Sequence, residues 1–230
     1  NENPFMTMSE AIEKHFNNSS IKVGVLSGPN LAKEIADEKV AGTVIASKHA
    51  DLCHQAREIL SSSTFKIYTS DDIKGIELAG ALKNIYAIIS GYCHSLDVGE
   101  NAIGLILTRS MAEMSNFAVN KGANPITFLG LAGMGDLVAT CFSKLSRNYQ
   151  FGWAIGEGLD IEAAKYKVGQ VAEGLNTIRI IHNEISSSKI KMPLVSGMHE
   201  ILFNSGSKEL LLEQIINSDI YVDVDFDVES

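Results

Sequence analysis

Cysteine is scarce in this chain, and its scarcity excludes two kinds of structural support. The 230 residues contain three cysteines, Cys53, Cys93 and Cys141, which lie far apart and form no C-x-x-C or C-x-x-H motif. Such an odd, scattered set predicts neither a disulfide framework nor a zinc site, and we expect no metal site. A reducing, cytoplasmic location fits this cysteine usage best.

Long apolar runs and an excess of positive charge are also lacking. Every apolar run is interrupted well before it could span a bilayer, so we expect no membrane insertion. The formal net charge of -9 argues against nucleic acid or an anionic membrane surface as a general partner. A small anionic ligand needs only a local cluster of donors and is not excluded. The first residues are not a signal peptide and include no initiating methionine, so we expect the later portion of a longer protein.

Neither a G-x-G-x-x-G fingerprint nor a Walker loop occurs in these residues. Gly133 and Gly135 lack a third glycine and a preceding strand, and Gly152 to Gly158 has the wrong spacing. The residues themselves therefore predict no dinucleotide-binding loop.

The first part of the chain alternates β and α patterns. Residues 21–27, 43–47 and 65–69 are β-branched runs that predict strands, with a helical pattern at 50–60 between the last two. This alternation predicts βαβ units and a mostly parallel sheet. Ligands bind at the carboxyl ends of the strands in such sheets, where residues 27–30 would lie, although Gly28-Pro29 alone favours an ordinary turn.

After Ser70-Asp71-Asp72, which could cap a helix, the β signals almost vanish. Helical patterns predict further helices from here on, at 76–92, 101–120, 147–156, 173–186, 193–203 and 208–217. One more helix is expected before the strands, at about 9–18. We therefore place a domain boundary near residue 72, with an α/β part at 1–72, an all-helical part at 73–218 and an acidic tail at 219–230.

Lys83 stands out within the apolar helix expected at 76–92. Its neighbours on the same helical face, Ala79, Gly80 and Ala87, are small. Lysine is seldom buried without a partner, and desolvation lowers its pKa toward the range in which it exchanges protons at neutral pH. The open alternative is a lysine whose flexible stem carries its charge to solvent.

Asp136 follows three glycines in the segment 130–137, which let the backbone turn sharply. A carboxylate near Lys83 would hold its ammonium group. The alternative is that Asp136 merely caps the helix that follows.

Ser146, Arg147 and Asn148 place a hydroxyl, a guanidinium and an amide at one expected helix start, a collection that suits a phosphate. An arginine in the first turn opposes the helix dipole unless an anion binds, which favours a binding role. Thr140 and Cys141 have simpler explanations, a helical hydroxyl and a buried thiol. Spacing alone thus gives only weak support to proton chemistry on a phosphorylated substrate.

Longer motifs carry a resemblance that spacing cannot supply. They are SGPNLAKEIA at 27–36, GIELAGALKNIYAI at 75–88, GENAIGLILTRSMAEM at 99–114, TFLGLAGMGDLVATC at 127–141, SRNYQFG at 146–152 and GQVAEG at 169–174. In this order, over about residues 21–217, the chain resembles NAD(P)-dependent glycerol-3-phosphate dehydrogenase of the bacterial type. The family's first, glycine-rich portion is absent.

The resemblance implies the C-terminal part of a Rossmann-type domain, an α/β remnant, followed by an all-α domain like the C-terminal domain of 6-phosphogluconate dehydrogenase, with the active site in the cleft between them. It further implies reversible reduction of dihydroxyacetone phosphate, a small phosphorylated substrate, to sn-glycerol 3-phosphate for phospholipid synthesis. The implied cofactor is NAD or NADP, and the implied assembly is a homodimer.

By the same resemblance, Lys83 protonates the carbonyl oxygen, Asn84 helps to place that oxygen and Asp136 holds the lysine. The matching family positions in contact with substrate are Gly28, Asn30, Lys83, Asp136, Thr140, Ser146, Arg147 and Asn148. Those beside the cofactor are Ala32, Arg147, Val171 and Glu173. The chain departs from the family at Asn30, where serine or threonine is usual, and at Ser110, where glycine is common.

Two alternatives stay open. A related two-domain dehydrogenase could act on a non-phosphorylated 2-hydroxy substrate, and insensitivity to Arg147→Ala would favour it. A non-catalytic remnant that only binds substrate or forms dimers would instead bind glycerol phosphate without binding a nicotinamide.

Overall fold

The computed structural model describes residues 5–16, 21–169, 172–207 and 209–216. The chain divides into two compact units. The first comprises residues 1–80 and 118–139, and the second comprises residues 81–117 and 140–230. In the described ranges, no helix is both long and apolar enough to cross a membrane. The expected acidic tail at 219–230 lies outside the described residues.

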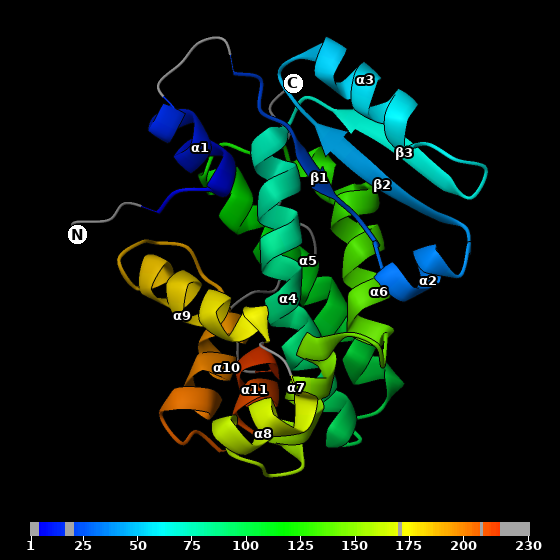
Figure 1. Cartoon of the computed structure of the whole chain (residues 1–230). Coiled ribbons are helices and arrows are strands. Elements are labelled where there is room, and N and C mark those ends of the chain that lie inside the picture. The colour runs from blue at the N-terminus through cyan, green and yellow to red at the C-terminus, as the bar shows by residue number, and fades with distance from the viewer. Residues whose placement is uncertain (1–4, 17–20, 170–171, 208, 217–230) are drawn as a thin grey trace. The chain divides into compact units, whose positions relative to one another are not determined.

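The first unit is built on a three-stranded sheet with the order β1-β2-β3 (Figure 1). Its strands are β1 (Val25–Ser27), β2 (Ala41–Ala46) and β3 (Phe65–Ser70). The crossover helix α3 (Ala50–Leu60) joins β2 to β3, which pair in parallel, as parallel neighbours require. β1 pairs antiparallel with β2, so the expectation of a mostly parallel sheet was wrong for this pair. The physical reason is the connection, because the short helix α2 (Ala32–Ala36) returns the chain without a full crossover.

The two faces of this sheet are covered by different elements. Side chains alternate along β2, so Val44 and Ala46 pack with Ile73, Ile76 and Ala132. Between them, Ile45 faces the other way and packs with Ile67 and Cys53 of α3. The first unit therefore holds two small apolar clusters, one on each side of β2.

The remaining helices match most of the expected positions. They are α1 (Met8–Phe16), α4 (Ile73–Ser95), α5 (Glu100–Asn120), η1 (Pro125–Leu129), η2 (Leu131–Gly135), α6 (Asp136–Phe142), α7 (Arg147–Gly156), α8 (Ile161–Val168), α9 (Glu173–Ser186), α10 (Pro193–Phe203) and α11 (Leu210–Ile216). Asp72 caps α4 as expected, because its Oδ1 accepts a hydrogen bond from the Gly75 amide at 2.9 Å.

In the second unit, glycines bring the backbones of α4 and α7 together. A Cβ added at Gly152 would lie 1.9 Å from the Ile88 carbonyl oxygen, and one at Gly91 would lie 2.0 Å from the Tyr149 carbonyl oxygen. Real Cβ atoms do not approach backbone so closely, so both positions need glycine. This contact fixes the start of α7 against the middle of α4.

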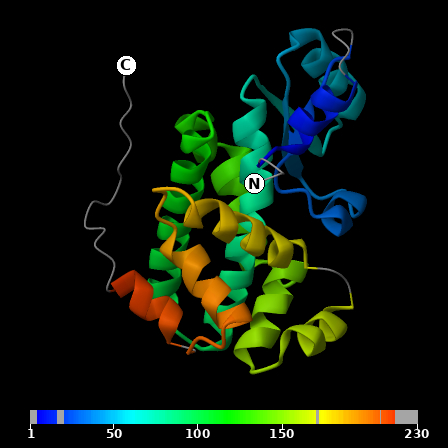
Figure 2. The same ribbon diagram turned by 90° about the vertical axis from the view of Figure 1, so that its left-hand side faces the viewer.

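The C-terminal helices of the second unit pack as neighbours, α9 on α10 and α10 on α11 (Figure 2). The N-terminus of α10 is capped from another helix by Glu113 of α5, whose carboxylate accepts the Leu194 amide at 2.7 Å and the Val195 amide at 3.4 Å. The Tyr86 hydroxyl of α4 donates to the same carboxylate at 3.1 Å. Burial raises the pKa of Glu113 to about 8, against the opposing effect of these donors.

Candidate functional site

Two expected substrate residues, Gly28 and Asn30, follow β1 directly in the first unit. A Cβ on Gly28 would lie 3.0 Å from the Thr43 Cα of β2, so glycine permits the close approach. Asn30 Nδ2 lies 2.9 Å from Thr43 Oγ1, whose hydroxyl donates to the Ser27 carbonyl oxygen at 3.0 Å.

These bonds fix the orientation of the Asn30 amide. A hydroxyl carries one proton, and Thr43 has already given it to Ser27, so Thr43 must accept from Asn30 Nδ2. The Asn30 Oδ1 atom is then buried without a hydrogen-bond partner. Asn30 therefore presents an acceptor, where the family's usual serine or threonine would present a hydroxyl.

Asp136 also belongs to the first unit and is 2% exposed. It begins α6 directly after the π-helical turn η2, with φ -74° and ψ -33°. The alternative that Asp136 is an N-cap is wrong, because an N-cap residue has an extended backbone and this one is helical. The turn requires Gly133, where a Cβ would lie 2.3 Å from the Phe128 carbonyl oxygen. Ala32, the expected cofactor neighbour, is exposed at the start of α2.

Lys83 and Asn84 lie in the second unit, on α4, and both are half-buried. Their neighbour Gly80, the last α4 residue of the first unit, packs against the end of β1, since a Cβ there would lie 2.6 Å from Ser27 Oγ. Gly80, one of the small residues before Lys83, thus serves a close contact with the end of β1. Because Lys83 and Asp136 belong to different units, their pairing stays a prediction.

Asn148 links three helices of the second unit. Its Nδ2 donates to Asn84 Oδ1 of α4 at 3.0 Å, and its Oδ1 accepts the Gly174 amide of α9 at 3.0 Å. Asn148 itself lies in the first turn of α7 and is 9% exposed. Gly174 must be glycine, because a Cβ would lie 2.5 Å from the Asn84 carbonyl oxygen. The Asn148 amide therefore fixes the orientation of Asn84 beside Lys83.

The start of α7 carries two of the residues predicted to bind an anion, Ser146 and Arg147. Ser146 is its N-cap, with the Ser146 hydroxyl accepting from the Tyr149 amide at 3.3 Å. The next residue, Arg147, is exposed in the first turn of α7, where the helix dipole is positive.

Two further expected site residues lie on helices of the described chain. Thr140 is buried on α6, and Glu173 is exposed at the first position of α9, whose N-cap Ala172 makes no side-chain cap bond. The remaining cofactor candidate, Val171, lies outside the described residues. Among the candidates of the second unit, Asn84 and Asn148 are joined directly by a hydrogen bond.

Comparison with family models identifies the chain over most of its length. Residues 72–213 match NAD-dependent glycerol-3-phosphate dehydrogenase C-terminus, and residues 1–53 match the N-terminus model of the same enzyme. The chain belongs to the NAD-dependent glycerol-3-phosphate dehydrogenase family. Glycerol-3-phosphate dehydrogenases [NAD(P)+] of Pseudomonas putida and Pseudomonas syringae pv. tomato are 47% and 48% identical to it over 222 residues, or 96% of the chain. The chain spans 64% of the length of these relatives.

Solved structures of the family agree with this assignment. A glycerol-3-phosphate dehydrogenase from Coxiella burnetii superposes with a TM-score of 0.86 at 34% identity, covering 90% of this chain and 63% of that one. The enzyme from Saccharomyces cerevisiae gives a TM-score of 0.78 at 27% identity, covering 90% of this chain and 62% of that one. These likenesses confirm the expected fold class, a Rossmann-type remnant followed by a helical domain.

Two supporting residues escaped the sequence reasoning. Thr43 orients Asn30 from a neighbouring strand, and Gly174 orients Asn148 from a helix 26 residues away along the chain. Gly174 lies in the GQVAEG motif, where a glycine after the helix-starting Glu173 was a usable signal of close packing. Nothing in the spacing of Thr43 pointed to its contact with Asn30.

Proposed function

We propose that this chain is the substrate-binding and proton-transferring part of an enzyme that interconverts dihydroxyacetone phosphate and sn-glycerol 3-phosphate with NAD or NADP. The observation that carries the proposal is the Asn84–Asn148–Gly174 network, which holds an amide beside Lys83 and lies at the start of the helix that bears Arg147. An amide near a lysine and a guanidinium at a helix N-terminus suit a substrate with a carbonyl and a phosphate.

In this reaction, Lys83 is the general acid for reduction. It gives a proton to the carbonyl oxygen as that oxygen gains negative charge, and in the reverse direction it removes the hydroxyl proton. Asn84 donates a hydrogen bond to the same oxygen, because its own Oδ1 already accepts from Asn148 and leaves Nδ2 as the group on offer. Asp136 is proposed to hold the lysine in its charged form.

The phosphate is assigned to Ser146, Arg147 and Asn148, with Thr140 as a weaker neighbour. Arg147 supplies a fixed positive fork for the anion, and the dipole of α7 adds to it. Gly28 and Asn30 are assigned to the glycerol end, where the buried acceptor Asn30 Oδ1 suits a substrate hydroxyl.

The residues of this chain fit only part of a dinucleotide. No glycine-rich fingerprint is present in the sequence, so a pyrophosphate-binding loop is not among these residues. The candidates on hand are Ala32, Arg147, Val171 and Glu173, of which Arg147 brings the only positive charge. A bound nicotinamide supplies or accepts the hydride, while this chain's residues position the substrate and move the proton.

We further propose a cytoplasmic location, in keeping with three buried cysteines that form no disulfide, Cys53, Cys93 and Cys141. The resemblance to the family also leads us to propose a homodimer. Phospholipid synthesis is the proposed use of the glycerol phosphate.

Lys83→Ala tests the catalytic assignment in the protein that also carries the family's preceding portion. Loss of NADH or NADPH absorbance on addition of dihydroxyacetone phosphate should slow about 100-fold or more, which is the usual contribution of a positioned general acid. The exposed lysine Lys189 provides the matched control, since Lys189→Ala should leave turnover unchanged. Nearly normal turnover of Lys83→Ala, with circular dichroism unchanged, would refute the role of Lys83.

Arg147→Ala tests the phosphate assignment in this chain itself. Glycerol 3-phosphate should broaden or shift its 31P resonance when titrated with the wild-type chain and much less with the variant, because a charge-assisted fork is lost. Inorganic phosphate as a competitor distinguishes phosphate binding from binding of the glycerol. Equal binding by wild type and variant would favour a non-phosphorylated substrate.

A further inference from the structure

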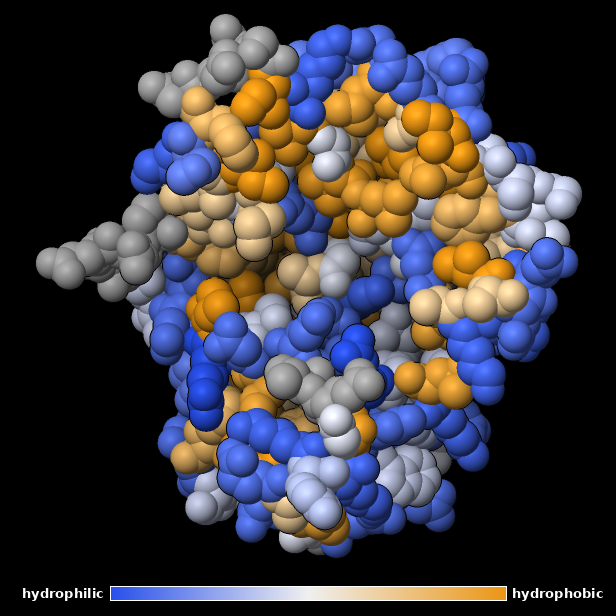
Figure 3. Space-filling model, in the orientation of Figure 1, coloured by the Kyte–Doolittle hydropathy of each residue, from blue (hydrophilic) through white to orange (hydrophobic). Residues whose placement is uncertain are grey.

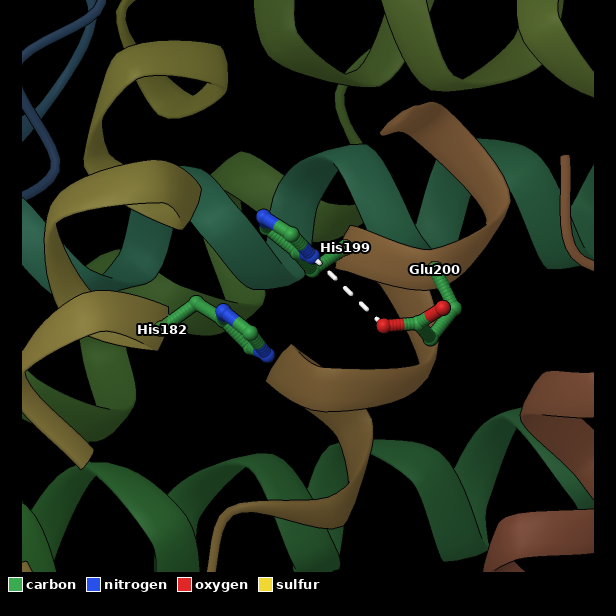
Figure 4. A group of neighbouring side chains, drawn as sticks. All are labelled: His182, His199 and Glu200. Carbon is green, nitrogen blue, oxygen red and sulfur yellow. Dashed lines mark ion pairs between the residues drawn. The ribbon is translucent and has the colours of Figure 1, made fainter. Parts of the chain in front are cut away.

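A cluster of metal-ligating side chains lies in the second unit, apart from the residues assigned above. His182 of α9 and His199 and Glu200 of α10 each bring one ligand atom within 4.8 Å of the others (Figure 4). The two imidazole rings are stacked, with centroids 3.7 Å apart and planes inclined by 5°. None of these three residues has a part in the proposed reaction.

One atom of the cluster is unsatisfied. His199 Nδ1 is buried and has no hydrogen-bond partner, since the nearest Glu200 oxygen lies 3.8 Å away, beyond hydrogen-bond distance. Burying a polar nitrogen without a partner is unfavourable, and such groups call for an explanation. A cation bound between His199 and Glu200 would give the His199 nitrogen a partner, while the Glu200 carboxylate, which accepts from Asn204 Nδ2 at 3.0 Å, would supply a second ligand.

Several charged and titratable groups lie around the cluster. Burial lowers the pKa of His199, and the neighbouring His182 and Arg179 lower it further, against the opposing effect of Glu200. Among the groups facing the pair, Arg179 has its guanidinium over the Phe203 ring, 4.3 Å from the centroid, and its positive charge opposes cation binding.

We propose that His182, His199 and Glu200 form a binding site for a divalent transition-metal ion of the zinc class. Two imidazoles and one carboxylate are a common ligand set for Zn²⁺, with water in the remaining position. A metal ion lies in the plane of each imidazole that binds it, so the parallel rings must tilt toward a common point. Both residues are only partly buried, which leaves room for this rotation. The bound ion would tie α9 to α10.

Titration calorimetry with Zn²⁺ on the metal-stripped chain tests the site. We expect one ion per chain and a binding constant that weakens about tenfold or more in His182→Ala. The matched control is His54→Ala, because His54 also lies beside a carboxylate, Glu58, at 3.5 Å but on an exposed single helix. The three cysteines are buried and should not compete.

Glu200→Gln provides a second variant of nearly equal size, and Co²⁺ provides a second readout, because its visible spectrum reports nitrogen and oxygen ligands in a tetrahedral site. Zn²⁺ binding should also weaken as the pH falls from 7.5 to 5.5, since protons compete for the imidazoles. Equal Zn²⁺ affinities of the wild type and His182→Ala would overturn the proposal. Loss of Zn²⁺ binding in His54→Ala instead would overturn it too. If His182→Ala or Glu200→Gln loses the circular dichroism signal of the folded chain, the other variant still tests the site.

Discussion

The two compact units cover their apolar groups in different ways. In the second unit, α4 and α7 touch through their backbones at Gly91 and Gly152, and Tyr86, Tyr92 and Phe151 are almost fully buried. In the first unit, the three-stranded sheet leaves Leu26 of β1 48% exposed and Tyr68 of β3 48% exposed. Apolar residues gather over the region of this sheet in the space-filling view (Figure 3).

This difference predicts where a small substitution lowers the free energy of unfolding strongly and where it does not. A contact between two helix backbones has no flexible side chain that can move aside, so an added methyl group must displace a whole helix. An exposed side chain at the edge of a small sheet has few partners to lose. The proposed substrate residues of the second unit, Asn84 and Asn148, lie on α4 and α7, the two helices held by direct backbone contact.

The largest effect should come from Gly152→Ala. Its new Cβ would lie 1.9 Å from the Ile88 carbonyl oxygen, so α4 and α7 must separate. We expect a loss of about 3 kcal/mol in the free energy of unfolding, at the upper end of typical overpacking costs. Urea denaturation followed by circular dichroism measures it.

The matched control is Gly104→Ala on α5, where the added Cβ meets nothing within 4 Å. There the better helix propensity of alanine should raise stability by about 0.5 to 1 kcal/mol. If the two alanine variants changed stability alike, close packing of α4 on α7 would not be what holds the second unit together.

A smaller, pH-dependent effect is expected from Glu113, which caps α10 from α5. Burial raises its pKa from 4.5 to about 8 in the folded chain. A raised folded pKa means that the folded state holds the proton more tightly, so the stabilisation is complete below about pH 4.5 and is lost as pH rises through 8. Between pH 6 and pH 8 the free energy of unfolding should fall by about 2 kcal/mol on this account.

Glu113→Gln removes the titrating group while keeping one oxygen for the Leu194 amide. Its unfolding free energy, measured in urea at several pH values, should therefore decline less than that of the wild type between pH 6 and pH 8. Parallel pH profiles for the two proteins would show that Glu113 is not the group whose ionisation weakens the fold.

Local signals predicted much of this fold. β-branched runs identified β2 and β3, and the expected helices at 147–156, 173–186 and 193–203 coincide with α7, α9 and α10. α8 was missed although its signals were present, since Asp160 caps its start and Gly169 ends it with φ 72°. A short helix with a weak apolar face shows little hydrophobic periodicity, so only its capping residues indicate it in the sequence.

Local sequence signals could not predict contacts between segments that are far apart in the chain. The antiparallel pairing of β1 depends on how residues 28–40 return the chain, and the burial of Glu113 depends on α10, which lies 80 residues further on. For the candidate site, the motifs located Asn84 and Asn148, but only the structure shows that their amides are bonded to one another. Sequence spacing could not place His182 near His199, because the two lie on different helices.

The smallest effect should come from Leu26→Thr on β1. Threonine is β-branched and suits strand geometry, and the lost apolar contact is small because the leucine is half exposed, so we expect a change within about 0.5 kcal/mol. Ile45→Thr on β2 is the control, because Ile45 is 3% exposed in the cluster under α3 and should cost about 2 kcal/mol. Urea unfolding of both variants gives the comparison. An equal loss in the two would mean that Leu26 is covered in solution, and the exposed sheet would then be better described as an occupied interface than as a tolerant surface.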